Sequence, residues 1–551
     1  MPLNPNGICS PTTLEGWHPS NAFWRSRKKQ WKAGLKVRQL FSSQLSTRTA
    51  DYKPARQIKQ SKEPMKKSRI VLVFVLFVLI FSTVPQEVTA QTPPTCGYDS
   101  NVESILAEVT QEDVVQWIRN FSGEDFVPIG VSQKKILTRF STQLFNLNVN
   151  ALAYPYLGEQ LRSFGFEEGT YLTDHAYTPN YVPTGTENMI DLHNVGEDYV
   201  SSDRNTKVVG NPDQTTTWKN KVVTIPGHGP NADEIVLMTA HMDSTSPQRN
   251  TNAPGAEDNA SGVAALMEAA RLFRFYKFDR TIKIIFFTGE EQGLWGSEAY
   301  VEDHPAEMDN IIGVVNLDMF GYDNDQDMCI ELHVGTMPDS NQVGTCFTEV
   351  NTNYNLGLAY DYVTNGAIGA SDHASFWDAG VGAIEVLENF QAHDESFGCN
   401  GTQDRNPHYH QITDTIDKMY MPATLATVKA GVGSVASLAL PMGKCFATDP
   451  QITATPQTES IIVNWAEIEG ADVYNVYRST TSCAGSFTQV AQVSTNSYKD
   501  VDIDLENDYF YKVQAAETGA VCYSQMSNCA VARVEVPIFF DIFIPLVIAG
   551  E

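Results

Sequence analysis

The sequence lacks any pair of cysteines in the CxxC spacing that holds zinc in small structural domains, and it lacks an excess of basic residues. Its 551 residues include 38 Lys and Arg against 66 Asp and Glu, which gives a net charge of −28. A chain this acidic repels the phosphates of nucleic acids and the surfaces of anionic membranes. We therefore expect neither a zinc knuckle nor a nucleic-acid partner.

The sequence also lacks an apolar run long enough to span a bilayer comfortably. Its longest run, Ile70–Phe81, has twelve residues, follows the basic stretch 66–69 and precedes the small residues 88–90. This order is typical of a secretory signal peptide. Residues 65–90 are therefore predicted to be a signal peptide, and the rest of the chain to be secreted or held at the cell surface. An uncleaved signal anchor is the alternative.

The two ends of the chain differ in composition from its middle. Residues 1–64 are basic and show no apolar periodicity, so we expect either a disordered extension or a start that lies upstream of the true one at Met65. The tail 536–551 is apolar but is interrupted by Asp541 and Pro545, so no stable membrane span is expected there. A last strand and a surface-sorting signal both remain open for this tail.

Eight of the nine cysteines follow the predicted signal peptide. An even number of cysteines in an exported chain predicts disulfide bonds formed in an oxidising compartment, although one sequence does not reveal how they pair. The eight are Cys96, Cys329, Cys346, Cys399, Cys445, Cys483, Cys522 and Cys529.

Residues 96–444 alternate short apolar runs with amphipathic segments such as 262–275. Continuous apolar runs of five to seven residues indicate strands that are buried on both faces, and such strands belong to sheets covered by helices on both sides. The fold class predicted is α/β, a three-layer α/β/α sandwich with a mostly parallel mixed sheet. The expected strands end at Ala240, Thr288, Leu317 and Leu387.

Residues 448–535 follow a different pattern, in which apolar and polar residues alternate with a period of two. This alternation predicts a small antiparallel β-sandwich. With Trp465 on an early strand and Tyr509, Tyr511 and Val513 alternating on a later one, the segment resembles a fibronectin type III domain. The resemblance implies a spacing or adhesive role, with an unknown partner.

Polar residues gather directly after the predicted buried strands of the α/β region. In an open α/β sheet, ligands bind beyond the carboxyl ends of the strands, so we expect these side chains to lie near one another. One such residue is unremarkable, but a series of them at successive strand ends predicts a site. The residues are His241, Asp258, Glu290, Glu291 and Asp318, joined by the later His410.

Imidazole nitrogen and carboxylate oxygen are the ligands of catalytic zinc. The hypothesis is that Asp258 bridges two zinc ions, one held also by His241 and Asp318 and the other by Glu291 and His410. Three carboxylates offset three of the four positive charges, which favours ionisation of a bound water near neutral pH. Glu290, next to a ligand, is the expected general base.

Two further carboxylates are expected to support the histidine ligands. Asp243 lies two residues after His241 in extended chain, so both side chains point to one face and the carboxylate can hold the second nitrogen of the imidazole. Asp414 lies four residues after His410 and is either a similar partner or a cap in the sequence ITDT.

The blocks HMDS, GAEDNASGVAALMEAAR, FFTGEEQGLWGSEAY, NLDMFGY, SDHASFWDAG and HQITDT resemble the co-catalytic zinc aminopeptidase family, from about residue 100 to 440. The resemblance implies the same five ligands, the same base and a cis peptide bond after Asp258. It also implies that Ser371 lies near the ligands without binding a metal ion. One stretch departs from the family: NGAIGASDH (residues 365–373) has neither the cysteines nor the tyrosine of the oxyanion-stabilising loop, and Ile368 stands near the place of the tyrosine.

The sequence thus predicts a secreted zinc aminopeptidase with two Zn²⁺ ions that removes N-terminal residues from peptides with a free N-terminus. A carboxypeptidase or a glutaminyl cyclase on the same scaffold is one alternative. A metal-free binding ectodomain is the other.

Overall fold

The computed structural model describes residues 96–141, 152–179, 217–391, 398–399, 401, 403–519 and 521–535. The predictions for the extension 1–64, the signal peptide 65–90 and the tail 536–551 lie outside these described residues. Among the helices that are described, none combines the length and the apolar character needed to cross a membrane.

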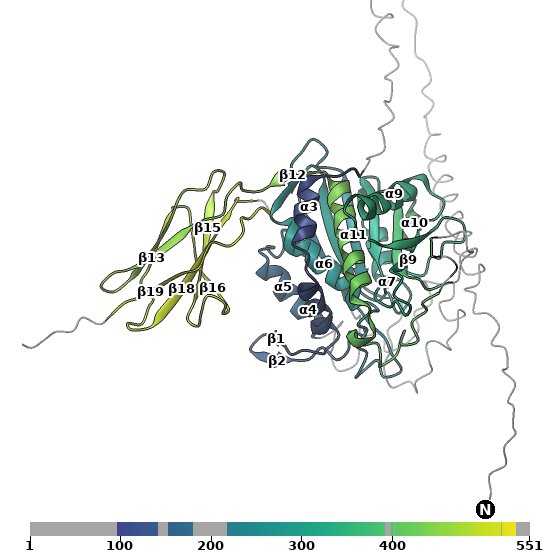
Figure 1. Cartoon of the computed structure of the whole chain (residues 1–551), viewed down its shortest axis with the longest axis horizontal. Helices are drawn as coiled ribbons and strands as arrows, with labels where there is room; N and C mark the ends of the chain where they lie inside the picture. The colour runs from purple at the N-terminus through teal and green to yellow at the C-terminus, as the bar shows by residue number, and fades with distance from the viewer. Residues whose placement is uncertain are drawn as a thin grey trace, which may run out of the picture. The chain divides into compact units, whose positions relative to one another are not determined.

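A mixed sheet forms the centre of the α/β region (Figure 1). It has eight strands in the order β10-β9-β11-β8-β5-β7-β4-β3. Strand β5 is parallel to β7 and β8, β8 is parallel to β11, and β10 is parallel to β9. The pairs β11–β9, β4–β7 and β3–β4 are antiparallel. The strands are β3 Leu172–Tyr177, β4 Trp218–Ile225, β5 Ile235–His241, β7 Thr281–Phe287, β8 Ile311–Leu317, β9 Cys329–His333, β10 Ala359–Val363 and β11 Ala383–Glu388.

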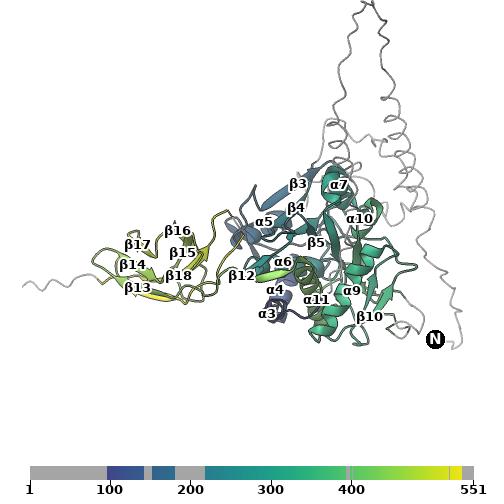
Figure 2. The ribbon, with the colours of Figure 1, turned by 90° about the horizontal axis from the view of Figure 1, so that it is seen from above.

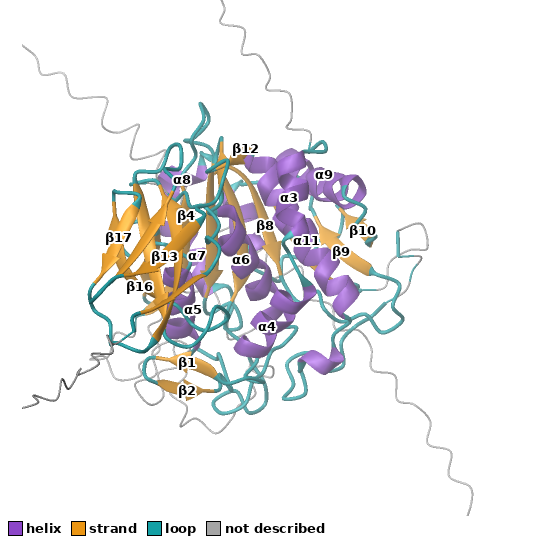
Figure 3. Ribbon diagram, turned by 60° about the vertical axis from the view of Figure 1, so that its left-hand side comes forward, coloured by secondary structure: helices purple, strands orange, loops and turns teal. Residues whose placement is uncertain are grey.

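Helices cover both faces of this sheet, so the predicted three-layer α/β arrangement is confirmed (Figures 2 and 3). Alternate residues of β5 point to opposite faces: Val236 and Met238 pack in one core cluster with α3, α4, α6, α9 and α11, whereas Ile235 and Leu237 pack in another with α7 and α10. All seven residues of β5 are buried, which is why its sequence reads as an unbroken apolar run. The helices are α3 Ser100–Ala107, α4 Gln111–Phe121, α5 Ala153–Ser163, α6 Ala260–Phe273, α7 Trp295–Asp303, α8 Pro305–Met308, α9 Pro338–Asn353, α10 His373–Ala379 and α11 Met421–Ala439, with the 3₁₀ turn η2 Ile416–Lys418.

Helix α6 lies unusually close to the ends of β5 and β8. The Asn259 side chain caps its N-terminus by accepting a hydrogen bond from the Gly262 backbone N–H at 2.8 Å. A Cβ atom on Gly262 would lie 2.5 Å from the Leu317 carbonyl oxygen and 2.8 Å from Ala240 Cβ, so only glycine permits this approach. Asp258, which precedes the cap, is thereby held at the carboxyl edge of the sheet.

The C-terminal region consists of antiparallel sheets, as the period-two pattern predicts. One sheet has the order β13-β14-β17 and the other the order β16-β15-β18-β19. Trp465, Tyr509, Tyr511 and Val513 all lie in one apolar core. The likeness to fibronectin type III domains stays a prediction. The strands are β13 Ile452–Pro456, β14 Ile461–Trp465, β15 Val473–Ser479, β16 Thr488–Val493, β17 Ser497–Asp500, β18 Asp508–Ala516 and β19 Ala530–Arg533. Two further antiparallel sheets have two strands each: β1 Val127–Ile129 pairs with β2 Ser132–Lys134, and β6 Tyr276–Phe278 pairs with β12 Pro441–Lys444.

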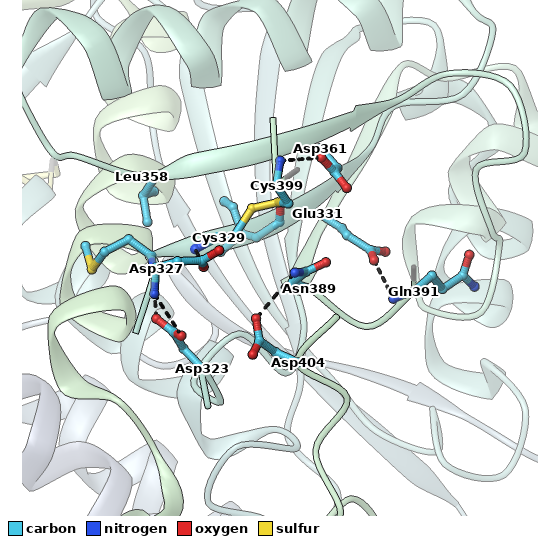
Figure 4. The surroundings of a disulfide bond; sticks show 12 residues. Asp323, Asp327, Cys329, Glu331, Leu358, Asp361, Asn389, Gln391, Cys399 and Asp404 are labelled. Atoms are coloured by element: carbon cyan, nitrogen blue, oxygen red, sulfur yellow. Dashed lines mark hydrogen bonds between the residues drawn. A yellow bond between two sulfur atoms is a disulfide. The ribbon is translucent and has the colours of Figure 1, made fainter. Parts of the chain in front are cut away.

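Every cysteine after the predicted signal peptide is paired, which confirms the expectation of disulfides and fits an oxidising, extracytoplasmic compartment. Figure 4 shows the bond between Cys329, at the start of β9, and Cys399, whose backbone N–H donates to Asp361. The pairs are Cys96–Cys346, Cys329–Cys399, Cys445–Cys522 and Cys483–Cys529.

Candidate metal centre

The ends of three parallel strands bring most of the predicted site residues together. Strand β5 ends at His241, β8 is followed at once by Asp318, and the turn after β7 carries Glu290 and Glu291. Because β5 is paired in parallel with both β7 and β8, the three carboxyl ends meet at one edge of the sheet.

His241, Asp258 and Asp318 form the first group of potential ligands. The Nε2 atom of His241 lies 3.2 Å from Asp258 Oδ1 and 3.1 Å from Asp318 Oδ1. All three side chains are buried, and one ligand atom from each lies within 4.8 Å of the others. That spacing suits the shell of one metal ion.

Asp258, Glu291 and His410 form a second group of the same kind. The Nε2 atom of His410 lies 3.1 Å from Asp258 Oδ2 and 3.1 Å from Glu291 Oε2. The ligand atoms again lie within 4.8 Å of one another. Asp258 thus belongs to both groups and turns a different carboxylate oxygen toward each histidine.

The donor set fits zinc, since imidazole nitrogen and carboxylate oxygen are its ligands in catalytic sites. The Oε1 atom of Glu291 is buried and has no hydrogen-bond partner, which is costly unless a cation satisfies it. Without a cation the imidazoles carry the compensating protons. Burial opposes this, but the carboxylates of Asp318 and Glu290 hold the pKa of His241 well above its usual range.

Glu290 stands beside these groups without belonging to either of them. Its Oε2 atom lies 3.8 Å from His241 Nε2. Burial raises the pKa of Glu290 well above its usual range, and His241 only partly opposes the shift. The raised pKa makes the Glu290 carboxyl group a stronger proton acceptor, and it lies beside the ligand groups, which is the position a general base needs.

Asp243 acts chiefly on the turn that carries the two glutamates. Its carboxylate accepts hydrogen bonds from the backbone N–H groups of Glu290 and Glu291, both at 3.4 Å. His241 Nδ1 lies 3.2 Å from the backbone oxygen of Asp243 and 3.6 Å from its carboxylate, so the carbonyl is the closer partner of the ring.

Asp414 holds the backbone at one ligand, and Ser371 pairs with a side chain close to another. The Asp414 carboxylate accepts from the backbone N–H groups of Glu257 at 3.0 Å and Asp258 at 3.1 Å, so it holds the shared aspartate. The Asp258–Asn259 peptide bond is cis, as the family resemblance implies. Ser371 accepts a hydrogen bond from the Asn316 side chain at 2.9 Å, two residues before Asp318.

Tyr409 is a site residue that the sequence analysis missed. Its ring stacks on the ring of His410, with the two centroids 3.7 Å apart. Burial and the nearby carboxylates of Asp258 and Glu291 raise the pKa of Tyr409 well above its usual range. Tyr409 directly precedes the predicted ligand His410 in the sequence, and this position could have identified it. His408, the other histidine of this loop, lies 2.8 Å from Thr413 Oγ1 and belongs to neither ligand group.

Arg139 is a second missed residue, and it is fully buried beneath the centre. Its guanidinium donates to the carbonyl oxygens of Met242, Phe121, Pro254 and Gly255 at 2.6 to 2.8 Å. Burial lowers its pKa to about 10, so it remains a cation at neutral pH. No motif marks a lone arginine far upstream of the ligands as part of a site.

We expect Arg139→Met to lower the free energy of unfolding by at least about 3 kcal/mol, because it leaves four buried carbonyls without a donor and removes a buried cation. Urea unfolding measures this change. The control is Arg162→Met, which removes an exposed ion pair with Glu168 and should cost less than about 1 kcal/mol. Equal losses in both variants would show that Arg139 has no special structural role.

Part of this chain is similar to a known protein family. Residues 220–436 match the sequence profile of Peptidase family M28. The chain is 33% identical over 187 residues to Aminopeptidase YwaD of Bacillus subtilis, covering 33% of this chain and 36% of the relative. It is 30% identical over 231 residues to a probable leucine aminopeptidase of Arthroderma otae, covering 40% of this chain and 58% of the relative.

The chain thus spans between about a third and three fifths of the length of these curated relatives. Among solved structures it is similar to the LapA aminopeptidase of Legionella pneumophila, with 19% identity and a TM-score of 0.42 over 64% of this chain and 78% of that one. The matched segment, 220–436, contains His241, Asp258, Glu291, Asp318 and His410. The segment of this chain that matches the Peptidase family M28 model, residues 220–436, is therefore the segment that carries the candidate metal centre.

Proposed function

We propose that this protein is a secreted zinc aminopeptidase that removes N-terminal residues from peptides. The observation that carries the proposal is the sharing of Asp258 between two histidine–carboxylate groups at the edge of the sheet. This arrangement lies inside the segment that matches Peptidase family M28, and two of the relatives named above are aminopeptidases by name. Paired cysteines are consistent with export.

In this proposal His241 and Asp318 hold one zinc ion, Glu291 and His410 hold a second, and Asp258 binds both. When bound, the ions supply Lewis acidity for the peptide carbonyl and lower the pKa of water. Asp414 and Asp243 keep the backbone of the ligand loops in place, so the ligand atoms need little rearrangement on binding.

Glu290 acts as the general base. It takes a proton from the attacking water and passes it to the nitrogen of the leaving peptide, so the amine departs in neutral form. Its position supports the role, because its carboxylate lies 3.8 Å from His241 Nε2 yet belongs to neither ligand group.

Tyr409 supplies a hydrogen-bond donor for the oxygen of the scissile carbonyl as negative charge develops there. This role replaces the tyrosine that is absent near Ile368. It is supported by the stacking of Tyr409 on His410 and by a phenol that lies in the field of the ligand carboxylates.

Digestion of three peptides of one sequence tests the function: one with both ends free, one with an acetylated N-terminus and one with an amidated C-terminus. An aminopeptidase cleaves the first and third, spares the second, and loses activity when a chelator removes zinc. Cleavage of the acetylated peptide alone among the blocked forms would identify a carboxypeptidase. Cyclisation of an N-terminal glutamine would identify a cyclase, and fewer than one zinc per chain a binding module.

Glu290→Gln should lower kcat by about 10²- to 10⁴-fold and leave the zinc content unchanged, because it removes the base without touching a ligand. Asp258→Ala should lose zinc as well as activity. Metal analysis beside steady-state kinetics separates the two effects, and exposed Glu112→Gln is the matched control. Near-normal turnover in Glu290→Gln would reject the base assignment.

Tyr409→Phe should lower kcat by about 10²- to 10³-fold with little change in KM or zinc content, since the lost hydrogen bond forms mainly in the transition state. Tyr98→Phe, at an exposed tyrosine, serves as control. If instead KM rose while kcat stayed constant, Tyr409 would contribute to substrate binding and not to stabilisation of the oxyanion.

A further inference from the structure

Arg405 presents a cation on the aromatic side of the metal centre. Its side chain is exposed, and its guanidinium carbon lies 4.9 Å from the centre of the Phe390 ring. Within the described part of the chain it forms no ion pair. A guanidinium stacked on an aromatic face keeps its in-plane N–H groups free, and those groups match the two oxygens of a carboxylate.

Two ring contacts connect Arg405 to a predicted zinc ligand. The rings of Phe390 and Tyr409 meet edge to face with centroids 6.0 Å apart, and Tyr409 stacks on His410 at 3.7 Å. The rings form a continuous wall from the metal centre to the cation. These contacts place Arg405 at the end of a series of rings that begins at a predicted ligand.

The backbone that carries Arg405 is fixed on both sides. Asp404 N–H donates to the Asn389 carbonyl at 2.7 Å, and the Asn389 side chain donates to the Asp404 carboxylate at 3.3 Å (Figure 4). Asn406 N–H donates to Glu388 Oε1 at 3.1 Å, at the end of β11. Arg405 therefore lies at the same edge of the sheet as the metal centre.

We propose that Arg405 is a specificity-determining residue that binds a substrate carboxylate, the side chain of an N-terminal glutamate or aspartate. This inference rests on the proposed aminopeptidase function. The methylene groups of the substrate side chain lie against Phe390 and Tyr409, and its carboxylate accepts hydrogen bonds from the guanidinium.

The test compares kcat/KM for the p-nitroanilides of glutamate, glutamine and leucine, which carry no terminal carboxylate. Arg405→Met keeps most of the length of the side chain and removes its charge. We expect it to lower kcat/KM for the glutamate substrate by about 10- to 100-fold and to change the glutamine and leucine values less than about threefold. Lys512→Met is the matched control, because Lys512 also lies over a ring, that of Phe487, in the C-terminal sheets.

A second pair of substrates identifies the source of the carboxylate. If Arg405→Met lowers kcat/KM for Leu-Gly but not for Leu-Gly amide or the glutamate anilide, the cation binds the peptide terminus and the side-chain assignment is overturned. An equal loss on all anilides would also overturn it, since that pattern indicates a structural role. Absence of cleavage of every substrate by the unaltered protein would reject the aminopeptidase function itself, which is a separate outcome.

Discussion

The structure depends on one electrostatic constraint, the concentration of buried carboxylates at the carboxyl edge of the sheet. Asp258, Asp318 and Glu291 lie almost out of water around two imidazoles. Such a group is stable only if positive charge enters with it, as protons on the histidines or as metal ions. Buried Arg139 contributes one permanent charge nearby, but the hydrogen bonds of its guanidinium go to four backbone carbonyls and not to the carboxylate oxygens.

The sheet and helix α6 position three of the residues that make up these groups. His241 and Asp318 are 77 residues apart in sequence, yet they end or follow neighbouring parallel strands, so the sheet register sets their distance. The position of Asp258 depends on the close approach of helix α6 that Gly262 permits, and on the two backbone hydrogen bonds accepted by Asp414. His241, Asp318 and Asp258 are therefore placed by the sheet register and by the packing of helix α6.

The strands and the grouping of polar residues at their ends could be predicted from the sequence, because apolar runs and parallel connections follow general rules. The partners of Asp243 and Asp414 could not, since a carboxylate near a histidine can bind either its ring or a backbone N–H. Arg139 was missed because burial of a cation leaves no local pattern. The pairing of Cys329 with Cys399 depends on which strands become neighbours, which spacing alone does not encode.

Because the buried carboxylates must balance charge in the centre, residues outside the centre are better placed to determine substrate selectivity. Inside the centre every carboxylate serves charge balance, so replacing one to suit a substrate would also alter metal affinity. The aromatic wall of Tyr409 and Phe390 carries no charge and separates the ligands from Arg405. Because the effect of a charge decreases with distance and screening, the guanidinium can change during evolution with little effect on the centre. Selectivity for the charge of the substrate can therefore change at Arg405 with little effect on catalysis.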